Sequence, residues 1–372
     1  MKYNSIPILY YHSIANHEKE RPWSFLSCKI EIFKAQMEYL YKKGYYTCNW
    51  DELYDHLIGK TQLPKKTVMI HFDDGFLDNW SVVFPIMKKY GLKFSIVVTP
   101  EFIQMTKEKR PFLKETTENN ILDWWGYLSI EELKEMEKSG LVDIQAHGFT
   151  HTWYPTSDRI IDIYNGTQIE PWLYWNEHIE EKPYWLSKNL FDVIPYGMPI
   201  FEHEKSLANL KAFIPDKNFV EDVIDLYDKN HTKDEILKQV LELKEKKYNN
   251  LIGRYETEEE TKQRLLKELK GTKEFLEKYL DKRIEYLVWP GGGNNELVEK
   301  LAFEVGYKLI SKGNKFNSFN SNIKKVMRMA ACHENFDVVL NKWFFIMQIK
   351  RGSGNILIND IVSFIKKIKK VI

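Results

Sequence analysis

Short apolar runs alternate with amphipathic segments over residues 6–151 of the chain. The runs predict buried strands, because each is brief, rich in β-branched or aromatic residues and bounded by polar positions. The amphipathic segments carry apolar positions at helical spacing. This alternation predicts an α/β fold with parallel strands and helices outside them. The predicted strands are residues 8–13, 45–47, 68–72, 94–98 and 142–146, and the predicted helices are residues 30–43, 50–58, 79–90 and 130–138.

The alternation resumes in the last third of the chain. Thr257 and Glu260 form a capping-box pattern at the start of a predicted helix over residues 257–280. A strand over residues 284–289 and a helix over residues 296–305 are predicted next, with a glycine-rich turn between them. These elements predict a second set of strand and helix units belonging to the same fold.

Residues 155–256 break the pattern. Their first half is rich in tryptophan and proline, and residues 221–247 form a charged, helical stretch. We therefore predict a mainly helical insertion between a first part, residues 1–154, and a second part, residues 257–372. The tail over residues 355–372 has the pattern of a basic amphipathic helix, which we expect to pack on the fold.

Two polar clusters follow predicted strands. His71-Phe72-Asp73-Asp74-Gly75 closes the strand at residues 68–72, and His147-Gly148-Phe149-Thr150-His151 follows the strand at residues 142–146. Adjacent carboxylates at the end of a buried strand are costly unless something uses them. One Asp and two His form a three-ligand set for a hydrolytic metal such as zinc, with a position left open for water.

Each cluster has a structural alternative. Asp-Asp-Gly is common in turns, and a pair of histidines four residues apart is a weak signal by itself. The two clusters together are more specific. Both fall at the carboxyl end of a predicted strand, where barrel enzymes carry their chemistry.

These clusters resemble the motifs of the polysaccharide deacetylases, the NodB-like group of carbohydrate esterase family 4. His71–Gly75 matches the family's T-F-D-D-G with His for Thr, and His147–His151 matches H-[ST]-x-x-H with Gly at the second place. The third motif is degenerate: Trp289 and Pro290 match, but its arginine is absent and Gly291 stands at the aromatic position. The resemblance covers about residues 6–154 and 257–312, and its Trp-Pro version is similar to poly-N-acetylglucosamine deacetylases.

The resemblance implies a distorted (β/α) barrel that removes N-acetyl or O-acetyl groups from a glycan with a divalent metal, zinc above all. It implies Asp74, His147 and His151 as metal ligands and Asp73 as the general base. His333 is the expected general acid, although the family's L-x-x-H pattern is absent.

Five further positions complete the expected site. Arg328 is expected to replace the missing arginine from another strand, over residues 325–329. Substrate contacts are expected from His12, at the end of the first strand, and from Trp289, Pro290 and Gly291. For His12 a purely structural role is the alternative.

The composition excludes some classes of function. A net charge of +1 gives no basic surface of the kind that nucleic acid requires, and no stretch approaches eighteen apolar residues. The chain starts without a signal-peptide pattern and has three widely spaced cysteines, which predicts a cytoplasmic protein. Aromatic residues make up 14% of the chain, and flat rings suit sugars, although most aromatics are core residues.

Two other functions stay open at this point. The degenerate third motif is compatible with a barrel that binds sugar without turnover. A related C–N hydrolase acting on a small cyclic amide would use the same ligands. The sequence leaves open which glycan is used and the oligomeric state. It also does not decide whether the insertion borders the active face or forms a separate subdomain.

Overall fold

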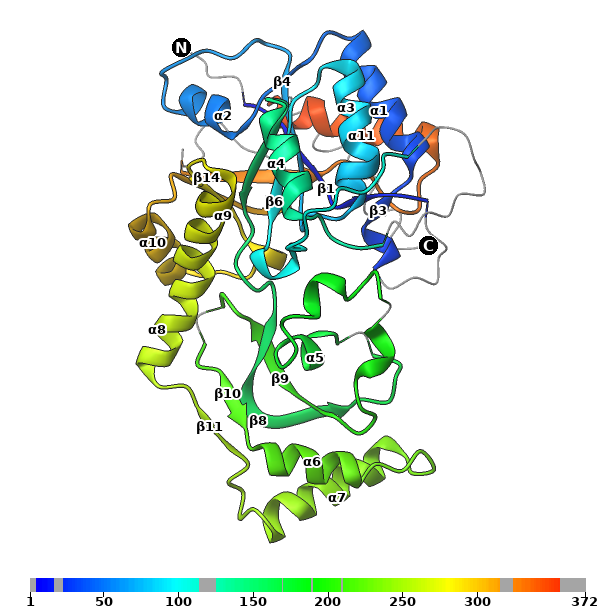
Figure 1. Ribbon diagram of the computed structural model, residues 1–372, viewed down its shortest axis with the longest axis vertical. Coiled ribbons are helices and arrows are strands. Elements are labelled where there is room, and N and C mark those ends of the chain that lie inside the picture. Colours follow the sequence, from blue (N-terminus) through cyan, green and yellow to red (C-terminus); the bar gives the residue numbers. More distant parts are fainter. Residues whose placement is uncertain are drawn as a thin grey trace.

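Seven parallel strands close into a barrel at one end of the molecule (Figure 1). The computed structural model describes residues 5–16, 23–113, 125–168, 170–188, 190–208, 210–314 and 324–354. The first strand pairs on both sides and closes the sheet: Leu9 is in register with Met329 and with Ile70. Around the barrel the strands are β1 (Ile8–Tyr11), β14 (Lys325–Ala330), β13 (Leu309–Asn314), β12 (Tyr286–Val288), β7 (Val142–Ala146), β6 (Phe94–Val98) and β5 (Thr67–Phe72).

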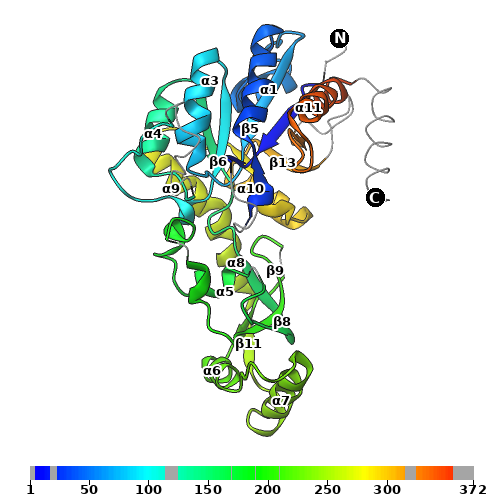
Figure 2. The same cartoon turned by 90° about the vertical axis from the view of Figure 1, so that its right-hand side faces the viewer.

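Helices surround the barrel (Figure 2), which is why β5, β6 and β7 are buried on both faces. β4 (Tyr46–Thr47) pairs with the amino-terminal end of β5, and β2 (Ser13–Ile14) pairs with β3 (Ser27–Cys28). The barrel helices are α1 (Ile30–Lys42), α2 (Trp50–Leu57), α3 (Phe84–Tyr90), α4 (Ile130–Lys138), α8 (Glu258–Leu266), α9 (Thr272–Leu280), α10 (Glu296–Val305) and α11 (Val338–Gly352). Short helical turns are η1 (Ser24–Leu26), η3 (Pro100–Phe102) and η7 (Pro290–Gly292), and the π-helical turns are η2 (Asn79–Val83) and η6 (Lys267–Gly271).

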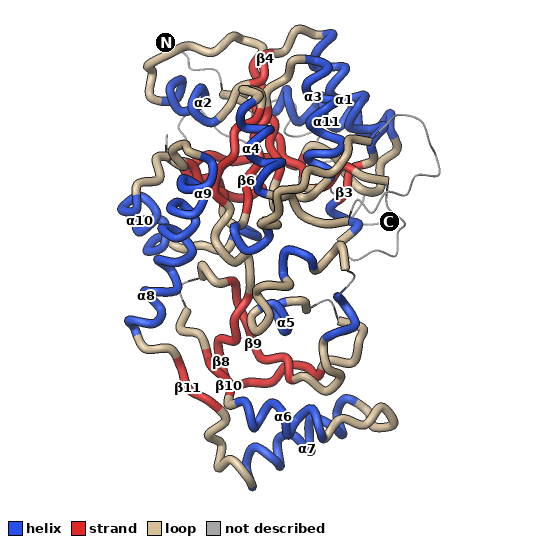
Figure 3. The backbone as a smooth tube through the Cα atoms, viewed as in Figure 1, coloured by secondary structure: helices blue, strands red, loops and turns tan. Residues whose placement is uncertain are grey.

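The segment after β7 lies beside the barrel at its carboxyl-terminal face and carries its own small sheets (Figure 3). It combines helices with two antiparallel strand pairs, neither of which joins the barrel sheet. Its elements are β8 (Trp153–Ile163), α5 (Trp172–Trp175), η4 (Lys182–Tyr184), η5 (Leu190–Val193), β9 (Pro199–Lys205), β10 (Phe213–Pro215), α6 (Lys217–Asp225), α7 (Lys233–Lys246) and β11 (Gly253–Tyr255). The domain boundaries drawn at residues 154 and 256 stay a prediction.

The predicted α/β barrel is confirmed. β12 lies in the same sheet as β5 and β7 although the insertion separates them in sequence. The predicted capping box at Thr257 is formed, and Ser129 caps α4 in the same way. The predicted helix over residues 257–280 contains the π-turn η6, which divides it into α8 and α9. β13 and α11 were not predicted, and the predicted helix over residues 355–372 lies outside the described residues.

Among the described helices, none is both long enough and apolar enough to cross a membrane.

Candidate active site

Three predicted metal ligands meet at the carboxyl ends of β5 and β7. Atoms of Asp74, His147 and His151 that can bind a metal all lie within 4.8 Å of one another. Asp74 Oδ1 is 3.2 Å from His147 Nε2 and 3.3 Å from His151 Nε2. Ligands 2.0–2.1 Å from a tetrahedral zinc ion are separated by about 3.4 Å, so the spacing suits such an ion.

The donor set also suits a cation. Asp74 Oδ1 is buried and has no hydrogen-bond partner among the described residues. His147 Nδ1 lies 2.8 Å from the carbonyl oxygen of Val288, which can only accept, so Nδ1 carries the proton. Its Nε2 therefore presents a lone pair to the Asp74 oxygen. Two acceptors face each other there, an arrangement that a bound cation would stabilise.

The backbone turns sharply to aim these side chains. Asp74 has φ of 69° and His151 has φ of 48°, values that side-chain-bearing residues rarely adopt. Gly75 continues the turn with φ of 72°, and a Cβ there would lie 2.9 Å from Val98 Cγ1. Strained backbone of this kind concentrates at functional sites.

Asp73 lies beside this set and is held by Arg328. Arg328 Nη1 lies 2.5 Å from each carboxylate oxygen of Asp73 and donates to His71 Nε2 at 2.9 Å. Burial would raise the pKa of Asp73, but the Arg328 guanidinium and the neighbouring histidines outweigh it, so the pKa lies below its ordinary range. Burial lowers the pKa of His71 to about 3, which keeps that ring neutral.

The loop between the two histidines is fixed from two sides. The buried carboxylate of Glu268, in the π-turn η6, accepts from the backbone N–H groups of Phe149 (2.8 Å) and Thr150 (3.1 Å) and from the Thr150 hydroxyl. Lys182, from the insertion, donates to the Thr150 carbonyl and pairs with Glu101 at 3.0 Å. Both contacts set where His147 and His151 sit.

These groups lie in a cavity of about 540 Å³. Asp73, Asp74, His147, His151, His12 and Arg328 all line it. Aromatic side chains make much of the remaining wall, namely Tyr10, Trp23, Phe25, Phe76, Phe102, Tyr127, Trp153, Trp172 and Trp175. The insertion supplies two of these rings, Trp172 and Trp175, together with Glu170 and Lys205, so it borders the cavity rather than standing apart from it.

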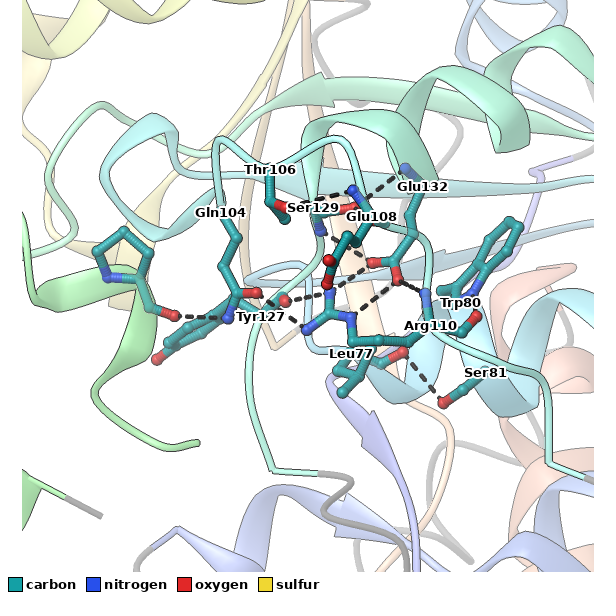
Figure 4. Close-up of polar contacts among 11 residues, drawn as sticks. Leu77, Trp80, Ser81, Gln104, Thr106, Glu108, Arg110, Tyr127, Ser129 and Glu132 are labelled. Carbon is teal, nitrogen blue, oxygen red and sulfur yellow. Dashed lines mark hydrogen bonds and ion pairs between the residues drawn. The ribbon is translucent and has the colours of Figure 1, made fainter. Parts of the chain in front are cut away.

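An ion-pair network supports one part of this wall (Figure 4). Arg110 donates to the buried Glu132 carboxylate, to the Tyr127 carbonyl at 2.8 Å and to Gln104 Oε1 at 3.1 Å. Gln104 in turn donates to the carbonyl of Pro183 in the insertion at 3.1 Å. The network ties the segment that carries Tyr127 to both the barrel and the insertion.

The structure corrects part of the predicted substrate contacts. His12 and Gly291 line the cavity, but Trp289 and Pro290 do not: Trp289 is buried in the barrel core, and Pro290 is a buried residue of the turn η7. Of the two backbone N–H groups after Asp74 that could donate to an oxyanion, that of Gly75 already donates to the Asp73 carbonyl at 2.9 Å. This leaves Phe76 as the candidate of the two.

His333 does not belong to the described cavity wall. The chain leaves the barrel after β14, and the His333 ring stacks on Phe336 with centroids 4.5 Å apart. Its Nδ1 accepts from the Asn335 N–H at 3.3 Å. His12 instead lies in the cavity, with Nε2 3.6 Å from Asp73 Oδ2, and it replaces His333 as the candidate acid.

Glu170, Lys205 and the insertion tryptophans were not predicted as site residues. The richness of the insertion in tryptophan was the signal available for Trp172 and Trp175. Trp185, another tryptophan of the insertion, is fully buried in the core. Nothing in the sequence near Lys205 marks it as a cavity residue.

Comparisons with known proteins agree with this geometry. A family model described as polysaccharide deacetylase matches residues 60–181. YxkH of Bacillus subtilis, assigned by name to the polysaccharide deacetylases, is 30% identical over 146 residues, which are 39% of this chain and 43% of that protein. Poly-beta-1,6-N-acetyl-D-glucosamine N-deacetylase of Escherichia coli is 21% identical over 41% of this chain and 21% of its own length. The chain thus spans less than half the length of these relatives.

Solved structures share the fold over most of the chain. A de-N-acetylase from Aggregatibacter actinomycetemcomitans has a TM-score of 0.56 at 18% identity, covering 91% of this chain and 100% of that one. The Streptococcus pyogenes deacetylase PplD has a TM-score of 0.51 at 18% identity, covering 93% and 97%. The BpsB deacetylase domain from Bordetella bronchiseptica has a TM-score of 0.52 at 15% identity, covering 88% and 95%. Residues 60–181 therefore match the polysaccharide deacetylase family model, in a chain whose barrel has the fold of solved deacetylases.

Proposed function

We propose that this protein is a metal-dependent hydrolase that removes acetyl groups from an N-acetylated glycan. One observation carries the proposal. The Asp74, His147 and His151 set and the Asp73–Arg328 pair line the same cavity. The match of residues 60–181 to the polysaccharide deacetylase family model and the name of the Escherichia coli relative support a glycan as substrate.

Asp74, His147 and His151 would hold the metal, and imidazole with carboxylate favours zinc. When bound there, a divalent metal lowers the pKa of a water and polarises an acyl oxygen.

The chain's own residues supply the proton transfers. Asp73 accepts the proton of the attacking water, and Arg328 keeps that carboxylate ionised and oriented. His12 gives a proton to the leaving amine, because it is the histidine in the cavity next to Asp73 that is outside the metal set. The Phe76 N–H is the candidate donor to the developing oxyanion.

The aromatic wall explains how a sugar would be held. Trp153, Trp172 and Trp175 line the cavity, and flat apolar rings suit the C–H surfaces of sugar rings.

The test is acetate release from N-acetylglucosamine oligomers by metal-loaded protein, with and without a chelator. We expect release that the chelator abolishes and added zinc restores, and none from Asp73→Asn. Glycan binding without release, by protein shown to contain metal, would refute the hydrolase and favour a sugar-binding barrel.

A further inference from the structure

Lys205 occupies the space that the third motif leaves empty. A Cβ built on Gly291 would lie 2.8 Å from Lys205 Cε, and one on Gly293 would lie 2.6 Å from Lys205 Cδ. The stem of Lys205 therefore runs across two residues that have no side chain. It comes from β9, on the insertion, and Trp153 is its partner in register on β8.

The ammonium group of Lys205 is anchored but not neutralised. Its Nζ donates to the Gly291 carbonyl at 2.6 Å, which uses one of three N–H donors. Within the described part of the chain, no carboxylate lies within 4.0 Å of this nitrogen, whereas the Arg328 guanidinium of the same cavity pairs with Asp73. Lys205, Gly291 and Gly292 together form one edge of the cavity.

The other charged groups of the cavity wall are already engaged. Arg328 is committed to Asp73 and His71 and stacks over the Tyr10 ring at 4.6 Å. Glu170 accepts from the Trp172 indole N–H at 2.6 Å. Lys205 is therefore the described cation of this wall that is available to a ligand.

We propose that Lys205 forms a cationic subsite for an acidic substituent, a carboxylate or a phosphate, on the glycan. An ammonium held in place by its packed stem loses little freedom on binding an anion, and charge-assisted hydrogen bonds are the stronger kind. This inference deepens the proposed function and rests on it. It makes the substrate an acidic N-acetylated glycan rather than a neutral one.

The experiment compares wild type with Lys205→Met, which keeps an unbranched stem over the two glycines and removes the charge. Lys211→Met is the matched control, because Lys211 lies on the insertion outside this cavity, 4.0 Å from Glu258. Acetate release is measured on a neutral N-acetylglucosamine oligomer, on an oligomer that alternates N-acetylglucosamine with a uronic acid, and on a phosphorylated N-acetylglucosamine oligomer.

We expect Lys205→Met to raise KM about tenfold for at least one acidic oligomer, at nearly constant kcat. A change of this size is expected when one charge-assisted hydrogen bond is lost. KM for the neutral oligomer and all values for Lys211→Met should change less than about twofold. An equal change on neutral and acidic substrates, or no change on any, would overturn the subsite.

Binding of the acidic oligomers to Asp73→Asn protein, measured by calorimetry with and without Lys205→Met, separates this inference from the proposed function. If no variant releases acetate, the hydrolase proposal fails. The subsite then stands if Lys205→Met weakens binding of an acidic oligomer about tenfold. It falls if the affinity is unchanged.

Discussion

Arg328 and Asp73 form a buried ion pair although 255 positions separate them in the chain, with Arg328 Nη1 2.5 Å from Asp73 Oδ1. The third motif lacks the arginine that the family resemblance led us to expect. β14 supplies one instead, because it neighbours β1 in the closed barrel and β1 neighbours β5. The guanidinium thus reaches the carboxylate from a different strand.

Replacing Asp73 with Asn should abolish turnover and leave the metal site intact. An amide cannot accept the proton of the attacking water, so we expect a loss of at least about a hundredfold in kcat. Elemental analysis should find wild-type metal content. Loss of metal from Asp73→Asn, with full activity in Asp74→Asn, would show that the two roles are reversed.

Replacing Arg328 with Met should shift the pH dependence of the reaction. Arg328 lowers the pKa of Asp73, so its removal raises that pKa, and the base then becomes protonated at a higher pH. The acidic limb of the kcat/KM profile should therefore move to higher pH by at least about one unit. An unshifted limb would mean that Arg328 has no influence on the base.

Metal content should depend on three side chains together. Ala at Asp74, His147 or His151 removes one of three protein ligands, and we expect each variant to lose most of its bound metal. Inductively coupled plasma analysis of purified proteins gives the answer. Full occupancy in all three variants would disprove the ligand set.

Replacing Glu268 with Gln should weaken metal binding without touching a ligand. An amide keeps one acceptor oxygen for the Phe149 and Thr150 N–H groups, but it removes the negative charge that strengthens these bonds and the acceptor of the Thr150 hydroxyl, so the loop that carries both histidines is held less firmly. Competition with a chelator should show zinc affinity reduced roughly tenfold. Glu256→Gln is the matched control, since Glu256 is a largely buried carboxylate paired with Arg264. Equal affinities in both variants would contradict this role.

His71 should make the fold sensitive to acid. The folded chain holds this ring neutral, with a pKa of about 3, whereas the unfolded chain takes up a proton below about 6.5. The unfolded state binds more protons in that window, so the free energy of unfolding falls as pH falls. Denaturant titrations of metal-free wild type and His71→Thr between pH 6 and pH 4 should differ in slope by up to about 1.4 kcal/mol per pH unit. Parallel curves would show that His71 does not carry this sensitivity.

The sequence by itself determined the alternation of strands and helices, since burial on both faces leaves continuous apolar runs in β5, β6 and β7. It also determined which strands are followed by the candidate base and the candidate metal ligands. Asp73 and Asp74 come directly after β5, and His147 comes directly after β7 with His151 four residues further on. Parallel strands bring their carboxyl ends to one face of a barrel.

Only the tertiary structure decided which distant residues complete the site. Arg328, which the sequence offered as the replacement arginine, reaches Asp73 because the barrel closes, and His333 stays outside the cavity because the chain turns away after β14. Lys205 lies over Gly291 because the insertion folds back on the barrel. Such contacts depend on the packing of segments far apart in the chain, and local patterns of apolar and polar residues carry no record of them.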